Sequence, residues 1–576
     1  MSNKSTDLLP AAGLSIVKGP SEPPLQQLTL GQFIDQGAEK FGSKPAIIVP
    51  WSGARLSYHE LNERTKNLAK GLLAFNIRKG DRVAIFSCED ERVVELFFAT
   101  ARIGAIIVLL NKTYTIQECD RAIRHADVSL LFLGDVVNHR TTRPLLKHLS
   151  TYPIPGLKHI ALTRWDTSVG SQWGTWDDIL RARGAISADT LREAEQAVHC
   201  KETIIFQFTS GTTGNPKASM LSHYNLVNNA HFVGERLNLT PDDVVCCPPP
   251  LFHVFGLVGG ILVNFTYGAS VVLPAREFDA TATVEALIKE RCTVLHGVPT
   301  MFSAILQNLH QSGTQVKTVR TGIVAGTKVP PALLTQIQEE LEYDNIAISY
   351  GMTETSPVTF MTAPLDGTEQ KMETVGTVFP HVLAKVVDKK NGILPRGSRG
   401  ELCVSGYLLQ KGYYKNPEKT AEVMIRDENG ALWMHTGDEA SIDRDGYCQI
   451  TGRIKDVIIR GGENVYPEEI EERLTSHPAI DQASVVGLKD EKYGEVISAF
   501  IQSQHGQDRP TLNEIKDWVR QELGRHKAPA YIQWVGPGDP ISQYPTTGSG
   551  KIRKDILRDI GNEMVEDAAK IRAAKL

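Results

Sequence analysis

Residues Phe208–Ala218 read FTSGTTGNPKA and form the most informative stretch of this 576-residue sequence. They follow the apolar run Thr203-Ile-Ile-Phe206, which is typical of a strand. A strand that leads into a loop of glycines and small hydroxyl residues can present backbone N–H groups and hydroxyls to a phosphate. Gly211 and Gly214 allow the backbone to approach phosphate oxygens, and Lys217 adds a mobile positive charge. The stretch is not a Walker A sequence, and a flexible surface loop can have the same composition.

Strand-like and helical segments alternate on both sides of this stretch. Tyr58–Phe75 has the pattern of an amphipathic helix, and Arg82–Ser87 that of a short buried strand. Further strand-like runs occur at Arg320–Ala325 and Ile346–Tyr350. This alternation predicts an α/β protein in which helices cover parallel sheets. The Pro- and Ser-rich residues 1–27 are expected to drape over the surface, and the polar residues 141–200 are expected to be a loop-rich connector.

Composition places the chain among ordinary globular proteins. Hydrophobic residues make up 41% and charged residues 22%, and the formal net charge of -5 does not indicate nucleic acid or an anionic membrane as the main partner. The eight cysteines show no C-x-x-C and no zinc spacing, so we expect reduced, mostly buried thiols. The most apolar window, Leu251–Pro274, contains His253 and Asn264, and we interpret it as core packing beside a site, with no transmembrane segment.

Several polar residues follow strands or glycine-rich turns. Glu354 comes just after the run Ile346–Tyr350, where ligands of open α/β sheets bind, and its carboxylate can hold Mg²⁺ against phosphate oxygens. Asp438 lies in a tight turn and can accept both hydroxyls of a ribose. Lys551 follows a Gly/Ser segment that can carry it into a cleft. The simpler alternatives remain open: His253 lies between aromatic residues, as packed core histidines do, and Lys551 alone would be an ordinary surface lysine.

Five stretches, taken in order, resemble the signatures of one superfamily: the AMP-forming acyl- and aryl-CoA synthetases, beetle luciferases and peptide-synthetase adenylation domains. They are FTSGTTGNPKA, YGMTETSP, HTGDEA, GRIKDVIIRGGENVYPEEIE and PTTGSGKIRK. Within it the chain is most similar to medium-chain and broad-specificity acyl-CoA ligases of the fungal peroxisomal type. The resemblance implies a large N-terminal domain of two α/β subdomains plus a distorted β-barrel, and a small mobile α+β C-terminal domain. The implied boundaries are an extension at 1–27, the N-terminal domain at 28–452, a hinge at 453–455, the C-terminal domain at 456–560 and a tail at 561–576.

The same resemblance implies a role for individual residues toward ATP, Mg²⁺ and CoA. The phosphate loop is Thr209, Ser210, Gly211, Thr212, Thr213, Gly214 and Lys217, while Gly326, Tyr350 and Gly351 complete the nucleotide site. Thr353 and Glu354 serve phosphate and Mg²⁺, Asp438 and Arg453 hold the ribose, Lys455 is the hinge residue, and Gly462 borders the path of the pantetheine thiol. Lys551 bridges the carboxylate and the α-phosphate, and His253 gates the acyl site.

The activity implied is that of an acid–thiol ligase, which forms an acyl adenylate and pyrophosphate from ATP and then an acyl-CoA and AMP. We expect an aliphatic medium-chain, branched or hydroxy acid, used in fatty-acid or secondary metabolism such as siderophore or toxin biosynthesis. The expected pocket residues, at about 252–262, 324–326 and 352–359, are mostly apolar or small. The alternatives are an adenylating enzyme that passes its acyl group to a carrier protein, and a luciferase-like oxygenase.

The chain ends in Ala574-Lys575-Leu576, a small–basic–leucine tripeptide similar to the S-K-L peroxisomal address. A frayed helix end would look the same. From the similarity to S-K-L we expect recognition by the peroxisomal import receptor, with a cytoplasmic location as the alternative. Nucleic acid is not an expected partner.

Overall fold

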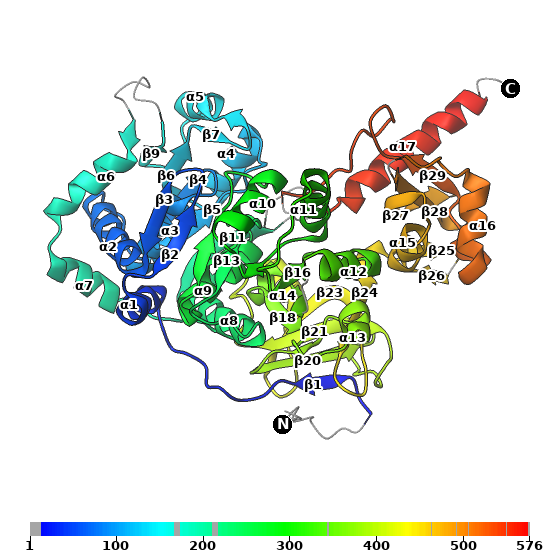
Figure 1. Ribbon diagram of the computed structural model, residues 1–576, viewed down its shortest axis with the longest axis horizontal. Helices are drawn as coiled ribbons and strands as arrows, with labels where there is room; N and C mark the ends of the chain where they lie inside the picture. Colours follow the sequence, from blue (N-terminus) through cyan, green and yellow to red (C-terminus); the bar gives the residue numbers. More distant parts are fainter. Residues whose placement is uncertain are drawn as a thin grey trace. The chain divides into compact units, whose positions relative to one another are not determined.

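The computed structural model describes residues 13–165, 173–209, 217–341, 345–461, 463–490, 492–504, 506–548 and 550–573. Within these residues the chain forms two compact units. The first contains Val17–Ala384 and Val404–Met434, and the second contains Lys385–Cys403, the residues from His435 onward and a short N-terminal piece. The α/β class predicted from the sequence is confirmed (Figure 1). The domain boundaries implied by the resemblance stay predictions.

One sheet of the first unit carries the Phe208–Ala218 stretch. Its strand order is β10-β9-β6-β4-β5-β11-β12, with parallel pairing up to β11 and an antiparallel β11–β12 pair. Its inner strands are continuous apolar runs because helices cover both faces of a parallel sheet. The bounds are β4 Arg82–Phe86, β5 Ile106–Leu109, β6 Val128–Gly134, β9 His159–Thr163, β10 Gly174–Thr175, β11 Thr203–Thr209 and β12 Lys217–Ser222.

A second sheet of this unit has the order β19-β18-β17-β16-β15-β13-β14-β2-β3. Its middle strands, from β17 to β2, are parallel, so their carboxyl ends share one edge. The bounds are β2 Pro45–Val49, β3 Ala54–Ser57, β13 Val244–Cys246, β14 Ser270–Val272, β15 Val294–Leu295, β16 Thr321–Ala325, β17 Asn345–Gly351, β18 Val358–Met361 and β19 Thr377–Val378. β7 Val136–Val137 and β8 Arg140–Thr141 form a separate hairpin.

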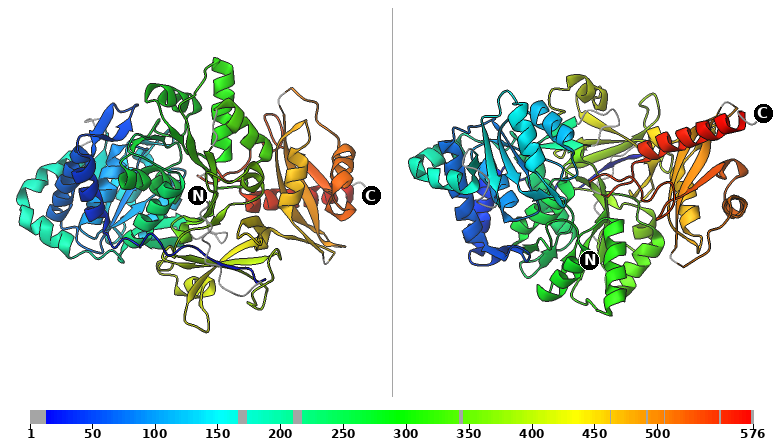
Figure 2. Two further views of the ribbon diagram at one scale, coloured as in Figure 1. Left: turned by 60° about the horizontal axis from the view of Figure 1, so that its bottom comes forward. Right: turned by 90° about the horizontal axis from the view of Figure 1, so that it is seen from above.

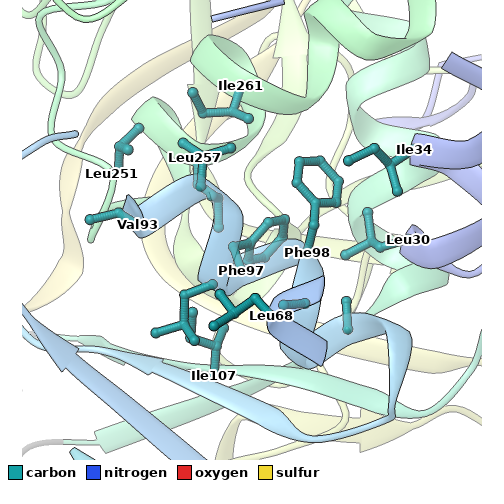
Figure 3. Close-up of a cluster of buried hydrophobic side chains, with 14 of the residues drawn as sticks. Leu30, Ile34, Leu68, Val93, Phe97, Phe98, Ile107, Leu251, Leu257 and Ile261 are labelled. Carbon is teal, nitrogen blue, oxygen red and sulfur yellow. The ribbon is translucent and has the colours of Figure 1, made fainter. Parts of the chain in front are cut away.

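Helices pack against these sheets and share an apolar core. Figure 3 shows side chains of α1, α2, α3, β5 and the segment around Leu257 packed together. α2 begins where Ser57 and Glu60 form a reciprocal capping box. The bounds are α1 Leu30–Phe41, α2 Tyr58–Ala74, α3 Glu91–Arg102, α4 Ile116–His125, α5 Arg143–Thr151, α6 Trp176–Ala182, α7 Ala188–Gln196, α8 His223–Arg236, α9 Val263–Tyr267, α10 Ala280–Lys289, α11 Pro299–Ser312, α12 Pro331–Glu340, α13 Thr368–Glu373 and α14 Pro417–Val423.

Two expectations need correction, and one is confirmed. Residues 141–200 are not mainly loop, because α5, α6 and α7 lie there, each with a buried face that the short polar sequence obscures. Part of the segment expected to drape over the surface forms a strand, β1 Ile16–Lys18, because its backbone pairs with β20. The apolar window is core, since the π-helix Phe255–Leu262 is buried along its whole length. In the described residues no helix has the length and apolar character to cross a membrane.

A further sheet has the order β1-β20-β21-β23-β22, and β24 also pairs with β23. It corresponds to the barrel-like part that the resemblance implied. The register places Asp438 of β23 opposite Arg453 of β24. The bounds are β20 Val382–Val387, β21 Gly400–Gly406, β22 Met424–Arg426, β23 Leu432–Ile442 and β24 Cys448–Arg453.

The C-terminal part of the second unit is a sheet with helices on both faces (Figure 2). Because neighbouring strand residues point to opposite faces, Val485 packs against α15 and α16 while Val486 packs against α17. The strand order is β26-β25-β28-β27, with β29 paired to β28. The bounds are β25 Ile458–Arg460, β26 Glu463–Val465, α15 Pro467–Thr475, β27 Ile480–Asp490, β28 Gly494–Ser503, α16 Leu512–Glu522, β29 Tyr531–Trp534 and α17 Lys554–Ala573.

Candidate active site

The two ends of the predicted phosphate loop face each other in the first unit. β11 ends at Thr209 and β12 begins at Lys217, and these two residues are partners in the antiparallel register. The predicted loop residues Ser210, Gly211, Thr212, Thr213 and Gly214 lie outside the described residues. The strand that precedes the loop is confirmed.

Glu354 lies beside Lys217 in a cluster that the sequence did not reveal in full. Its carboxylate is buried, and Tyr413 donates a hydrogen bond to Oε1 at 2.7 Å. The Lys217 ammonium lies over the Tyr413 ring, 5.7 Å from its centroid. Loss of water and the like charge of Lys419 lower the pKa of Lys217, while Glu354 opposes that shift. A buried, oriented carboxylate next to a lysine fits Mg²⁺ on a phosphate chain, because Mg²⁺ is held by few carboxylates together with phosphates.

Tyr413 reaches Glu354 because backbone hydrogen bonds join the segment around Tyr413 to strand β12 and to Glu354 itself. The backbone N–H of Met220 in β12 donates to Gly412 at 3.0 Å, and that of Tyr414 donates to Ala218 at 2.8 Å. The N–H of Gln410 donates to the carbonyl of Glu354 at 2.9 Å. The two contacts to β12 join residues nearly 200 positions apart, so no spacing in the sequence pointed to Tyr413.

Gly326, Tyr350 and Gly351 come together at one sheet edge. Gly326 follows β16, and Tyr350 and Gly351 end β17, its parallel neighbour. Gly326 has φ +98°, and a Cβ on Gly351 would lie 1.8 Å from the carbonyl oxygen of Pro357, so neither position accepts a side chain readily. The three residues predicted for the nucleotide site therefore lie at the ends of neighbouring parallel strands.

Thr353 and His253 have structural surroundings that leave their predicted roles open. Thr353 begins the short 3-10 helix Thr353–Thr355 and is buried. The Nδ1 atom of His253 accepts a hydrogen bond from the N–H of Phe255 at 3.2 Å, at the start of the π-helix. A gating role for His253 stays a prediction.

Asp438 and Arg453 form an ion pair in the second unit. The tight turn predicted for Asp438 is wrong, because the residue lies within strand β23, where its backbone pairs with β24. Arg453 Nε lies 3.1 Å from Asp438 Oδ1, and only 7% of the Asp438 side chain is exposed. The pair follows from the register of β23 and β24, which sets the two residues opposite each other. It offers a fixed carboxylate that can accept ribose hydroxyls.

Lys551 lies in the electrostatic field of this pair. Crowding by protein atoms and the like charge of Arg453 lower the pKa of Lys551 to about 8, while Asp438 and Asp456 oppose the shift. The side chain as a whole retains exposed surface, so water still reaches it and tempers the shift. Its backbone is held by Thr547, whose hydroxyl accepts from Lys551 N at 3.1 Å.

The residue just before the predicted hinge is a glycine that has no room for a side chain. Gly452 has φ +142°, and a Cβ there would lie 2.4 Å from the carboxylate of Glu468. Burial raises the pKa of Glu468, and Lys554 opposes the shift. Lys455 is exposed in the 3-10 helix Ile454–Asp456. Gly462 lies outside the described residues.

Two family models match the chain: "AMP-binding enzyme" over residues 34–414 and "AMP-binding enzyme C-terminal domain" over residues 469–551. The chain is 45% identical to "Acyl-CoA ligase sidI" of Aspergillus fumigatus, over 96% of this chain and 94% of that protein. It is 37% identical to "Medium-chain acyl-CoA ligase ACSF2, mitochondrial" of Danio rerio, over 96% of this chain and 91% of that protein.

Solved structures are similar along nearly the whole chain as well. ATP-bound MatB from Rhodopseudomonas palustris has a TM-score of 0.76 at 25% identity, covering 93% of this chain and all of that one. The anthranilate CoA ligase AuaEII in complex with anthranoyl-AMP has a TM-score of 0.81 at 22% identity, covering 95% of this chain and 99% of that one, and shows the fold alone.

Proposed function

The chain belongs to the AMP-binding enzyme family and is an acyl-CoA ligase, and we propose that it activates an aliphatic medium-chain, branched or hydroxy acid. The observation that carries the reaction class is the 45% identity to an acyl-CoA ligase over almost the entire chain. The conversion of ATP, acid and CoA to acyl-CoA, AMP and pyrophosphate follows from it. A carrier protein as acceptor and an oxygenase reaction are not favoured.

In the first step a carboxylate oxygen of the acid attacks the α-phosphorus of ATP, and pyrophosphate leaves. Two anions must meet, so positive charge is needed where they approach. We assign Lys551 to the space between the carboxylate and the α-phosphate, and Lys217 to the phosphate tail. Bound Mg²⁺ would neutralise phosphate oxygens. Glu354 would hold that ion, and Tyr413 fixes the carboxylate of Glu354.

The remaining assigned residues position the nucleotide and the second substrate. Asp438 accepts the ribose hydroxyls while Arg453 fixes its orientation. In the second step the thiolate of CoA attacks the acyl carbonyl carbon, and AMP leaves. We infer that the chain turns about Lys455 between the two steps, which withdraws Lys551, and that the pantetheine arm passes Gly462.

The acid is inferred from the π-helix Phe255–Leu262. Every residue of this segment is buried and apolar or glycine, which suits an aliphatic chain. His296 lies beside it, with its ring 6.1 Å from that of Phe255, and burial lowers the pKa of His296 to about 4. The ring is therefore neutral at pH 7. A neutral polar group in an apolar wall also suits an acid with a hydroxyl group.

The test is CoA-dependent AMP release from ATP over a panel of carboxylic acids. The panel spans short to long fatty acids, branched acids, hydroxy acids, hydroxycinnamates and amino acids. A response to aliphatic or hydroxy acids with thioester formation supports the proposal, and a single sharp response indicates a dedicated pathway. A response confined to aromatic or amino acids overturns the proposed acid class. AMP release without a thioester would instead indicate a carrier-protein acceptor.

A further inference from the structure

A thiol, an imidazole and a carboxylate meet on two neighbouring strands of the second unit. Glu401 and Cys403 lie on β21 and His435 lies on β23, and their ligand atoms are all within 4.8 Å of one another. His435 Nδ1 is 2.8 Å from Glu401 Oε2 and 3.4 Å from Cys403 Sγ. Cys403 is buried, and the other two are partly exposed, which leaves an approach from solvent.

Glu401 and the neighbours of the cluster residues also hold the part of β23 that carries Asp438. Glu401 Oε1 accepts a hydrogen bond from the N–H of Gly437 at 3.1 Å. The Thr436 hydroxyl donates to the carbonyl of Leu402 at 2.8 Å and accepts from the N–H of Asp438 at 3.1 Å. Gly437 directly precedes Asp438, so a change that moves Glu401 should also move the Asp438 carboxylate, which we assign to the ribose.

We propose that Glu401, Cys403 and His435 form a binding site for a soft divalent cation such as Zn²⁺, and that the bound cation weakens ATP binding by drawing Glu401 away from Gly437. Thiolate, imidazole and carboxylate together select Zn²⁺-like ions over Mg²⁺. With metal–ligand bonds of about 2.0–2.3 Å, ligand atoms of a tetrahedral site lie about 3.3–3.8 Å apart. The cluster needs only a small adjustment, in which the hydrogen bond between His435 and Glu401 is replaced by a bond from each residue to the ion.

Binding exchanges a proton for the metal. Burial and the nearby charge of Glu401 raise the pKa of the Cys403 thiol, and Lys385 opposes that shift, so the free thiol keeps its proton. The cation replaces that proton on sulfur, and the proton passes to the buffer. His435 must offer the lone pair of Nδ1, so the proton that Nδ1 donates to Glu401 in the free protein moves to Nε2.

The first test measures the cation alone and does not depend on the catalytic assignment. Co²⁺ is titrated into the full-length protein in the absence of ATP, and the thiolate-to-cobalt charge-transfer absorption is recorded. We expect a saturable band that Zn²⁺ abolishes by displacement. Cys403→Ala should remove it, with Cys403→Ser as a second variant if the first does not fold, whereas Cys448→Ala, a buried cysteine of neighbouring β24, should leave it unchanged. A missing band, or a band that survives in both Cys403 variants, overturns the proposal.

The second test measures the coupling and rests on the proposed function. The KM for ATP in AMP formation is measured with and without a Zn²⁺ concentration that saturates the site but stays far below the ATP concentration. We expect KM to rise several-fold with little change in kcat, and Cys403→Ala to lose this sensitivity. Glu401→Ala should raise the KM without zinc, while Glu401→Gln, which keeps an acceptor for Gly437, should restore it. A band without these effects refutes the coupling, and inactivity of the unmodified enzyme refutes the proposed function.

Discussion

At the scale of single residues, the hydrogen bond between Tyr413 and Glu354 is the clearest addition made by the structure. It orients a buried carboxylate that we assign to Mg²⁺. Hydrogen bonds to charged groups contribute about 1.5–3 kcal/mol. Tyr413→Phe should therefore raise the Mg²⁺ concentration for half-maximal adenylation by about 10-fold. The matched control is Tyr414→Phe, whose hydroxyl bonds Asp127 instead, and it should have no such effect. Equal effects of both variants would refute the role of Tyr413.

Lys551 leads to a prediction about pH. The charged form is the one that bridges two anions, and its pKa is lowered to about 8 in the free protein. A lowered pKa means that the charge is present below pH 8 and is lost as the pH rises through that value. The kcat/KM for acyl-adenylate formation should therefore fall above about pH 8, whereas an unperturbed lysine would hold to about 10.4. In an active Lys551→Arg variant, the fall of kcat/KM should move to higher pH. A fall that stays at the same pH would show that another group causes it.

The same residue should separate the two half-reactions. Lys551→Ala should slow adenylation by roughly 10²–10³, the loss expected for one donor that stabilises developing charge. Thioester formation from preformed acyl-AMP should be spared, because Lys551 has no assigned part in it. Single-turnover assays of each step provide the measurement. An equal loss in both steps would contradict the assignment.

At the scale of elements, a buried arginine joins four helices of the first unit. Arg102 of α3 is 1% exposed, and it bonds Asp35 of α1, Thr65 of α2 and Glu195 of α7. Arg102→Met should destabilise the protein by about 1.5–3 kcal/mol, because it removes the buried guanidinium to which these two partly exposed carboxylates and the Thr65 hydroxyl are hydrogen-bonded. Denaturant unfolding provides the measurement. Arg192→Ala, which removes an exposed ion pair with Asp189, should cost less than about 1 kcal/mol.

Gly452 tests the turn from β24 into the predicted hinge. Its φ of +142° and the nearby Glu468 carboxylate leave no comfortable place for a methyl group. Gly452→Ala should cost about 1–3 kcal/mol of stability, the usual cost of such a backbone conformation. It should also raise the KM for ATP, because Arg453 is the next residue. Gly184→Ala, where no atom lies within 4 Å of the added carbon, is the control and should change neither quantity.

At the scale of the whole molecule, each unit has its own apolar core, and the C-terminal sheet is covered on both faces by its own helices. The tail Ala574-Lys575-Leu576 lies beyond the described residues, and we propose that it directs the protein to peroxisomes. Removing these three residues should move the protein from peroxisomes to the cytoplasm in cells with labelled peroxisomes, with the activity of the purified enzyme unchanged. Import that persists without the tripeptide would exclude it as the address.

The amino-acid sequence by itself determined the fold class, the alternation of strands and helices around the motifs, and the place of Glu354 just after β17. These features depend on local periodicity and on motifs of a few residues, which are visible in a linear chain. The sequence did not predict the helices within 141–200, because short polar helices bury too few residues to show a helical hydrophobic periodicity.

Only the tertiary structure decided which distant residues meet. Tyr413 reaches Glu354 through pairing with β12, Arg102 finds partners on three other helices, and Glu401 meets His435 across neighbouring strands. The physical reason is that such contacts depend on strand order and register, which are set by the packing of the whole core. No short-range signal in the sequence carries that information.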